Sequence, residues 1–88
     1  IPVQNRKIRF EYRPDNGLIL IMNNGMPIPD QDLSRIFTIF FTRRKDGRGI
    51  GLYLALHSLA AVGYRIFASN ATEHNKLGGA CFVIAKNE

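Results

Sequence analysis

The chain has 88 residues, of which 45% are apolar, and its 12 basic and 7 acidic residues give a net charge of +5. This length suits one small domain with a thin core, and we interpret residues 1–88 as a single-domain fragment of a longer protein. No apolar run reaches the roughly 18 residues of a membrane span and no signal-peptide pattern is present, so we expect no membrane contact. The single cysteine, Cys81, excludes an internal disulfide and indicates a cytoplasmic setting.

The first third of the chain predicts a β-hairpin. Residues 7–12 alternate polar and apolar side chains, which is typical of a half-buried strand with Ile8, Phe10 and Tyr12 on its inner face. The stretch Asp15-Asn16-Gly17 supplies a turn, because asparagine and glycine tolerate positive φ angles. The wholly apolar run 18–22 then predicts a central strand that is covered on both faces.

The middle of the chain predicts a short helix and an aromatic segment. Two prolines and a glycine within residues 23–29 exclude regular structure there. Asp30 is expected to cap a short helix whose inner face carries Leu33, Ile36 and Phe37. The aromatic run 37–42 leads into a polar, glycine-rich loop that we expect to act as a lid.

The last part of the chain predicts a helix followed by two strands. Residues 50–62 are apolar almost all round, so we expect this helix to be buried on most of its surface and to end at Gly63. Residues 64–69 and 80–85 predict strands, the second with Cys81 as a buried, inert thiol. The order of elements predicts an α+β fold, a two-layer α/β sandwich whose mixed or antiparallel sheet carries helices on one face.

Residues 43–52 have the composition of a phosphate cradle. Alternate glycines at 47, 49 and 51 let the backbone approach a ligand closely. A helix that begins near Ile50 would aim its free N–H groups at the same ligand. Four cations lie beside these glycines, namely Arg43, Arg44, Lys45 and Arg48. A P-loop is excluded because no Gly-Lys-Ser/Thr follows, and a glycine-rich surface turn stays open as the alternative.

Four segments in order resemble the nucleotide boxes of one family. They are Asn-Asn-Gly-Met-Pro-Ile-Pro at 23–29, the aromatic segment 36–42, Gly-Arg-Gly-Ile-Gly-Leu at 47–52 and Gly-Gly-Ala-Cys-Phe at 78–82. The family is the catalytic ATP-binding domain of sensor histidine kinases, part of the Bergerat-fold group with gyrase and the ninety-kilodalton heat-shock chaperone. The resemblance implies the Bergerat ATP-binding fold, incomplete at the N-terminus.

The resemblance implies two sets of ATP-binding residues. Asn23 stands where the family has an aspartate that accepts a hydrogen bond from the adenine amino group, while Gly25 and Ile28 would shape the adenine pocket. The lid and the following helix would contribute Thr42, Arg43, Arg44, Lys45, Gly47, Arg48, Gly49, Ile50, Gly51 and Leu52. The implied reaction transfers the terminal phosphate of ATP to a histidine on a separate phosphoacceptor and dimerisation domain, which then serves a response regulator.

Three departures from the family pattern matter, and two of them concern the chemistry. The amide of Asn23 is uncharged and carries a donor NH₂ group, unlike a carboxylate. Pro27 stands where the family has a glycine, and Ala80 stands where it usually has a hydroxyl near the adenine. The asparagine-bearing helix that holds Mg²⁺ in the family is expected upstream of Lys7, so we assign neither a metal ligand nor a catalytic residue here.

Two functions therefore stay open. The first is the ATP-binding portion of a sensor histidine kinase, inactive as 88 residues alone. The second is a degenerate Bergerat-fold domain with weak or no ATP binding that serves as a regulatory or protein-interaction module. A nucleic-acid partner is not expected, because the net charge of +5 is moderate and much of the excess lies in the glycine-rich loop. Neither histidine has a phosphoacceptor context: we interpret His57 as a helix-surface or packing residue and His74 as a plain loop residue.

Overall fold

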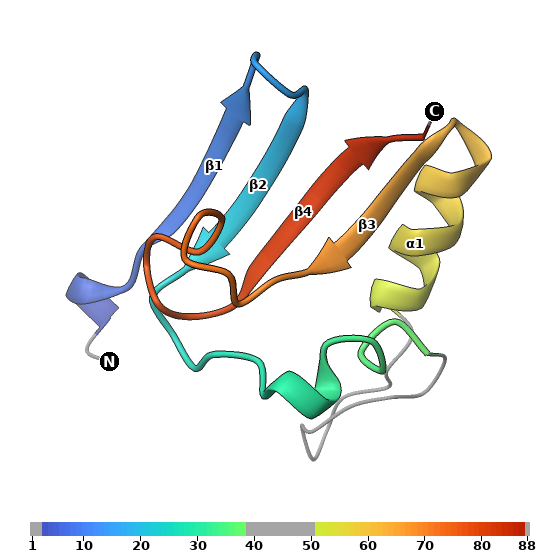
Figure 1. The fold of residues 1–88 in the computed structure, drawn as a ribbon. Coiled ribbons are helices and arrows are strands. Elements are labelled where there is room, and N and C mark those ends of the chain that lie inside the picture. The colour runs from blue at the N-terminus through green and yellow to red at the C-terminus, as the bar shows by residue number, and fades with distance from the viewer. Residues whose placement is uncertain (1–2, 39–50, 88) are drawn as a thin grey trace.

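The computed structural model describes residues 3–38 and 51–87, and its strands lie side by side in one sheet (Figure 1). The strands β1 (Ile8–Arg13), β2 (Leu18–Asn23), β3 (Tyr64–Ala68) and β4 (Cys81–Lys86) pair antiparallel in the order β1-β2-β4-β3. The helical elements are the 3₁₀-helices η1 (Val3–Asn5) and η2 (Asp30–Asp32) and the α-helix α1 (Gly51–Ala61). The predicted α+β class and the predicted hairpin are confirmed.

The β1–β2 hairpin closes through the predicted turn. Gly17 has a φ of +70°, and its N–H donates to the carbonyl of Arg13 at 2.8 Å. The side-chain oxygen of Asn16 accepts from the N–H of Leu18 at 3.2 Å. A side chain at Gly17 would meet open space, so the positive φ is what requires glycine at this position.

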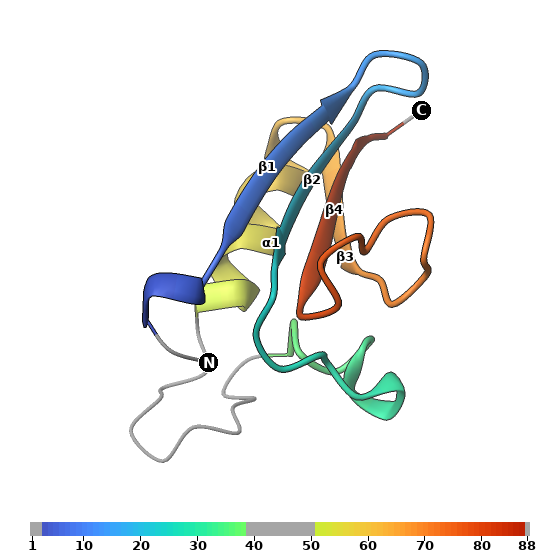
Figure 2. The same cartoon turned by 90° about the vertical axis from the view of Figure 1, so that its left-hand side faces the viewer.

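The sheet carries one apolar cluster on each face. The loop-side cluster packs with Leu77 of the 69–80 connection and consists of Leu20, Met22, Cys81 and Val83. The helix-side cluster packs with leucines of α1 and consists of Ile36, Phe37, Ile66 and Ala68. Figure 2 shows α1 on one side of the sheet and the 69–80 connection on the other.

The predicted inner face of β1 is exposed, so that part of the prediction is wrong. Ile8 and Phe10 are each 72% exposed and Tyr12 is 64% exposed. The register places Phe10 opposite Ile21 and Tyr12 opposite Ile19, so this strip lies on the helix side. Because α1 packs over β3, at the other edge of the sheet, it does not reach the strip (Figure 1).

The strand β2 is covered more fully on one face than on the other. Leu20 and Met22 are 0% and 1% exposed on the loop side, whereas Ile19 on the helix side is 36% exposed. The expectation of burial on both faces is therefore met only in part. The reason is the same as for β1, since the single described α-helix packs over β3 and not over β2.

The apolar helix α1 is less buried than its sequence suggests. None of its residues is fully buried, and Leu54 is 54% exposed. One stripe, formed by Leu52, Leu56 and Leu59, packs on the helix-side cluster. The prediction of burial on most of the surface is wrong because only this stripe faces the sheet. The helix ends as predicted before Gly63, whose φ is +88°. No helix in the described ranges combines the length and hydropathy that a membrane crossing needs.

The segment after β2 is held against the end of β3 by a side chain. Asp30 does not cap a helix: Pro29 occupies the cap position of the one-turn η2, and no side-chain cap bond forms. Instead, Asn70 Nδ2 donates to Asp30 Oδ1 at 2.8 Å and to the carbonyl of Ile28 at 2.6 Å. The predicted inner face of this segment is confirmed at Phe37, whose ring meets Phe82 edge-on at 6.3 Å.

Candidate nucleotide-binding site

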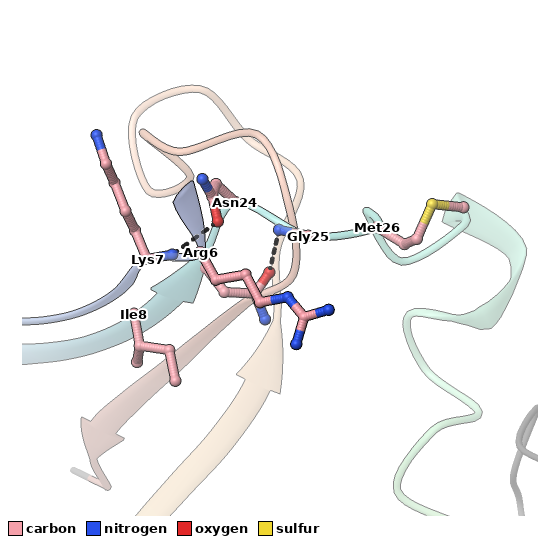
Figure 3. Close-up of a pocket in the computed structure, with 7 residues that line it drawn as sticks. Arg6, Lys7, Ile8, Asn24, Gly25 and Met26 are labelled. Carbon is pink, nitrogen blue, oxygen red and sulfur yellow. Dashed lines mark hydrogen bonds between the residues drawn. The ribbon is translucent and has the colours of Figure 1, made fainter. Parts of the chain in front are cut away.

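A cavity of about 500 Å³ lies at the end of the β1–β2 hairpin that is remote from its turn. Figure 3 shows the residues that line it, which come from the segment before β1 and from the segment where β2 ends. They are Arg6, Lys7, Ile8, Asn23, Asn24, Gly25 and Met26. The cavity therefore forms around the first of the four predicted nucleotide boxes.

The side chain of Asn23 is oriented by two backbone donors. Its Oδ1 accepts from the N–H of Gly25 at 2.9 Å and from the N–H of Ala80 at 3.0 Å. Only the oxygen of an amide can accept these bonds, so the NH₂ group occupies the other end. Within the described part of the chain, Asn23 Nδ2 has no hydrogen-bond partner.

Gly79 makes this arrangement of Asn23 possible. Its N–H donates to the carbonyl of Asn23 at 3.0 Å, and the N–H of Asn23 donates to the carbonyl of Ala80 at 3.0 Å. A Cβ at Gly79 would lie 2.3 Å from Asn23 Oδ1 and 2.5 Å from the N atom of Gly25. A side chain does not fit there, so glycine is required by close approach. Gly79 was not among the predicted site residues, although the Gly78-Gly79 pair was a signal for it.

Two further asparagines stabilise the backbone around the cavity. Asn24 Oδ1 accepts from the N–H of Lys7 at 2.9 Å, and its Nδ2 donates to the carbonyl of Asn5 at 2.8 Å. These two hydrogen bonds fix the segment before β1 against the end of β2 and bring Arg6 and Lys7 to the cavity. No local pattern in the sequence indicates it, because the partners are separated by 17 and 19 residues.

Asn75 acts in the same way on the other side of the cavity wall. Its Nδ2 donates to the carbonyl of Gly79 at 2.6 Å, and its Oδ1 accepts from the N–H of Gly78 at 3.0 Å. Gly78 itself has a φ of +82°. The turn that brings Gly79 and Ala80 to Asn23 is thus held by one side chain.

The predicted site residues fall into three groups in the structure. Asn23 and Gly25 line the cavity. Ile28 and Leu52 both pack on the helix-side cluster, while Gly51 is the exposed first residue of α1. The others lie outside the described residues, namely Thr42, Arg43, Arg44, Lys45, Gly47, Arg48, Gly49 and Ile50. Of the predicted site residues, the structure therefore brings Asn23 and Gly25 together at the cavity.

The described residues do not include three His, Cys, Asp or Glu side chains close enough to hold a metal ion. Cys81 is fully buried in the loop-side cluster, as predicted, and this burial raises the pKa of its thiol.

The two histidines have structural contacts. His57 lies on the exposed surface of α1 against the ring of Tyr53, with ring centroids 4.4 Å apart, as the spacing of the two residues predicts. His74 is more than a plain loop residue: its Nδ1 lies 2.8 Å from Ser69 Oγ, and its ring meets Phe67 edge-on at 6.2 Å. It helps to fold the 69–80 connection onto the loop side of the sheet.

Comparison with known proteins identifies the relatives of this chain. Residues 2–87 match the family described as histidine kinase-, DNA gyrase B- and HSP90-like ATPases. The chain is 34% identical over 85 residues to the sensor protein CitS of Halalkalibacterium halodurans and 31% identical over 71 residues to the sensor histidine kinase TmoS of Ectopseudomonas mendocina. These alignments cover 93% and 81% of this chain but 15% and 7% of the two relatives.

A solved structure shares the fold. The mycobacterial sensor histidine kinase MprB superposes with a TM-score of 0.67 and 25% sequence identity, over 88% of this chain and 52% of that one. The chain thus spans about half of the solved structure and a small part of the curated relatives. It belongs to the family of histidine kinase-, DNA gyrase B- and HSP90-like ATPases and is similar within it to the ATP-binding domain of sensor histidine kinases.

Proposed function

We propose that this chain forms part of the ATP-binding domain of a sensor histidine kinase and that the cavity beside Asn23 and Gly25 receives the base of the nucleotide. The observation that carries the proposal is the position of this cavity. It lies at the first nucleotide box of a chain whose residues 2–87 match the ATPase family. Its volume of about 500 Å³ is within the range of small-molecule sites.

The phosphates are proposed to bind at the glycine-rich loop before α1. The helix α1 has 11 residues, long enough for its N-terminal N–H groups to favour an anion. Gly47, Gly49 and Gly51 would bring further N–H groups to the phosphates. The neighbouring cations Arg43, Arg44, Lys45 and Arg48 would offset the phosphate charge.

In the intact protein, the terminal phosphate of ATP would pass to a histidine on a separate phosphoacceptor and dimerisation domain. A response regulator in the cytoplasm would be the indirect partner. Mg²⁺ would accompany the phosphates, as phosphoryl transfer requires. The role of the present residues is to bind and orient the nucleotide, and none of them is assigned a covalent step.

The test is calorimetric titration of the intact protein with Mg²⁺ and a non-hydrolysable ATP analogue. We expect saturable binding that weakens at least about tenfold when Gly47 and Gly49 are both replaced by alanine, because the backbone can no longer approach the phosphates. Asn16→Asp, at the far end of the hairpin, serves as the control and should bind like the wild type. Absence of binding by the folded wild-type protein would refute the proposal and favour a regulatory or interaction domain.

A further inference from the structure

We propose that the base pocket reads the 6-position of a purine with a hydrogen-bond donor, so that 6-oxopurine nucleotides such as ITP and GTP bind more tightly than ATP. The proposal rests on the proposed function, since it concerns the base of the nucleotide that the cavity receives. Asn23 recognises the base through a hydrogen bond donated by the NH₂ of its side-chain amide.

The orientation of this amide follows from its neighbours. Asn23 Oδ1 accepts from two backbone N–H groups, those of Gly25 and Ala80. If the amide were flipped, its NH₂ group would face these same two donors at 2.9 and 3.0 Å, and both backbone N–H groups would lose their acceptor. The oxygen therefore stays on the protein side.

The neighbouring backbone also leaves the amide no room to shift. The ideal Cβ position at Gly79 lies 2.3 Å from Asn23 Oδ1, so the oxygen sits directly against the backbone of this residue. Gly79 is held in turn by its N–H bond to the carbonyl of Asn23 and by the bond from Asn75 Nδ2 to its own carbonyl. The amide is thus fixed by hydrogen bonds from Gly25, which follows β2, and from Ala80, which precedes β4.

The opposite end of the amide presents donors. Asn23 lines the cavity, and its Nδ2 has no hydrogen-bond partner among the described residues. The charged side chains that line the cavity, Arg6 and Lys7, carry only donors. Asn24, the remaining polar side chain, uses its oxygen on the N–H of Lys7 and its nitrogen on the carbonyl of Asn5. The side chains around the cavity therefore favour a ligand edge that is rich in acceptors.

Purines differ in this respect at one position. Guanine and hypoxanthine carry an acceptor oxygen at the 6-position, next to the acceptor N7, whereas adenine carries an amino donor there. An NH₂ group that faces the adenine amino group leaves two donors without an acceptor, while the same group facing a 6-oxo group forms a hydrogen bond. A carboxylate at residue 23 would reverse the preference, because its second oxygen is an acceptor.

The experiment compares the binding of ATP and ITP to the intact protein, since these nucleotides carry opposite groups at the 6-position. Displacement of a fluorescent nucleotide gives the ratio of the two Kd values for the wild type, for Asn23→Asp and for the matched control Asn16→Asp. GTP is measured in parallel. The ratio is used because the added carboxylate repels the phosphates of both nucleotides alike. Asn23→Asp retains an acceptor for both backbone N–H groups and is expected to fold.

For the wild type we expect ITP to bind at least about tenfold more tightly than ATP, with GTP on the same side. Asn23→Asp should invert this order, and Asn16→Asp should leave it unchanged. Binding of ATP as tight as that of ITP by the wild type, or an unchanged ratio in Asn23→Asp, would overturn the inference while the proposed function stands. If no nucleotide displaces the probe from any folded variant, the proposed function itself fails.

Discussion

The side-chain oxygen of Asn23 accepts a hydrogen bond from the backbone N–H of Ala80, which lies 57 residues further along the chain. The same oxygen accepts from Gly25, two residues away. One amide therefore joins a local turn to a distant strand. A change at residue 23 should alter the shape of the cavity. It should also weaken the contact between the end of β2 and the residues before β4.

Asn23→Ala should lower the free energy of unfolding by about 2 kcal/mol, because the partly buried N–H of Ala80 and the exposed N–H of Gly25 both lose their acceptor. Asn23→Asp should not lower it, since a carboxylate oxygen accepts the same bonds. Urea denaturation measures both. Asn16→Ala is the control, since the oxygen of Asn16 accepts a single exposed bond. Equal urea midpoints for Asn23→Ala and Asn16→Ala would show that the Asn23 amide does not stabilise the contact between β2 and β4.

Gly79→Ala should destabilise the protein more than Gly78→Ala does. At Gly79 the new Cβ would collide with Asn23 Oδ1 and with backbone atoms at 2.3 to 2.5 Å, which we expect to cost about 3 kcal/mol and to weaken nucleotide binding. At Gly78 the Cβ meets open space, and only the φ of +82° is unfavourable, at about 1 kcal/mol. Thermal unfolding of both variants tests this. The reverse order would mean that Asn23 does not contact Gly79 closely.

Glu11 should give the fold a small pH dependence at acidic pH. Arg13 Nε donates to its carboxylate at 2.5 Å, and this bond, aided by the charges of Arg13 and Arg9, lowers the pKa of Glu11 below its ordinary value of 4.5. A lowered pKa in the folded state means that the stabilising contribution is present above pH 4.5 and is lost as the pH falls through the folded-state value.

Glu11→Gln should therefore flatten the profile of stability against pH below pH 4.5 and leave the shape of the profile above it unchanged. Chemical denaturation at a series of pH values measures this effect. Because the pair lies at the surface, about 1 M salt should reduce the difference between the two proteins. A difference that persists at high salt would argue against a charge effect.

The exposed strip of β1 should contribute more to self-association than to stability. Ile8 and Phe10 are 72% exposed on an edge strand, and such surfaces favour association between chains. Replacing both with threonine, which is polar and has a high strand propensity, should reduce association in light scattering. The free energy of unfolding should change by less than about 1 kcal/mol.

Leu20→Ala is the matched comparison for that double variant. Leu20 lies in the loop-side cluster with 0% exposure, so its truncation should cost about 2–5 kcal/mol and should not reduce association. If the threonine variant were as destabilised as Leu20→Ala, the strip would be part of the core.

Local patterns in the sequence predicted much of the fold. The turn at Gly17, the helix end at Gly63 and the four strands follow from residue preferences and short-range alternation. The extent of burial could not be predicted from these local patterns. Alternation in β1 identifies an apolar face, but only the position of α1 over β3 decides that this face stays uncovered.

The candidate site shows the same division. The motifs identified Asn23 and Gly25, which line the cavity. The direction of the Asn23 amide depends on a bond from Ala80, 57 residues away, and the role of Gly79 depends on its close approach to the same amide, so no local window of sequence contains either. The asparagine in place of the family's aspartate was visible as a loss of charge, and the base preference proposed from it required the two backbone donors to be located.

The two apolar clusters differ in how completely their residues are buried. Leu20, Met22, Cys81 and Val83 are at most 1% exposed on the loop side, whereas the buried apolar residues of the helix-side cluster are 8–9% exposed. The tightest packing among the described residues therefore lies on the loop side of the sheet, away from α1. A change in the position of α1 would leave this tightest packing intact.

This difference in packing should be visible in the rates of amide hydrogen exchange. We expect the central strands β2 and β4 to exchange slowest and α1 to open at lower free energy, with or without nucleotide. Substitutions on the exposed surface of α1 should therefore cost less stability than substitutions in the loop-side cluster.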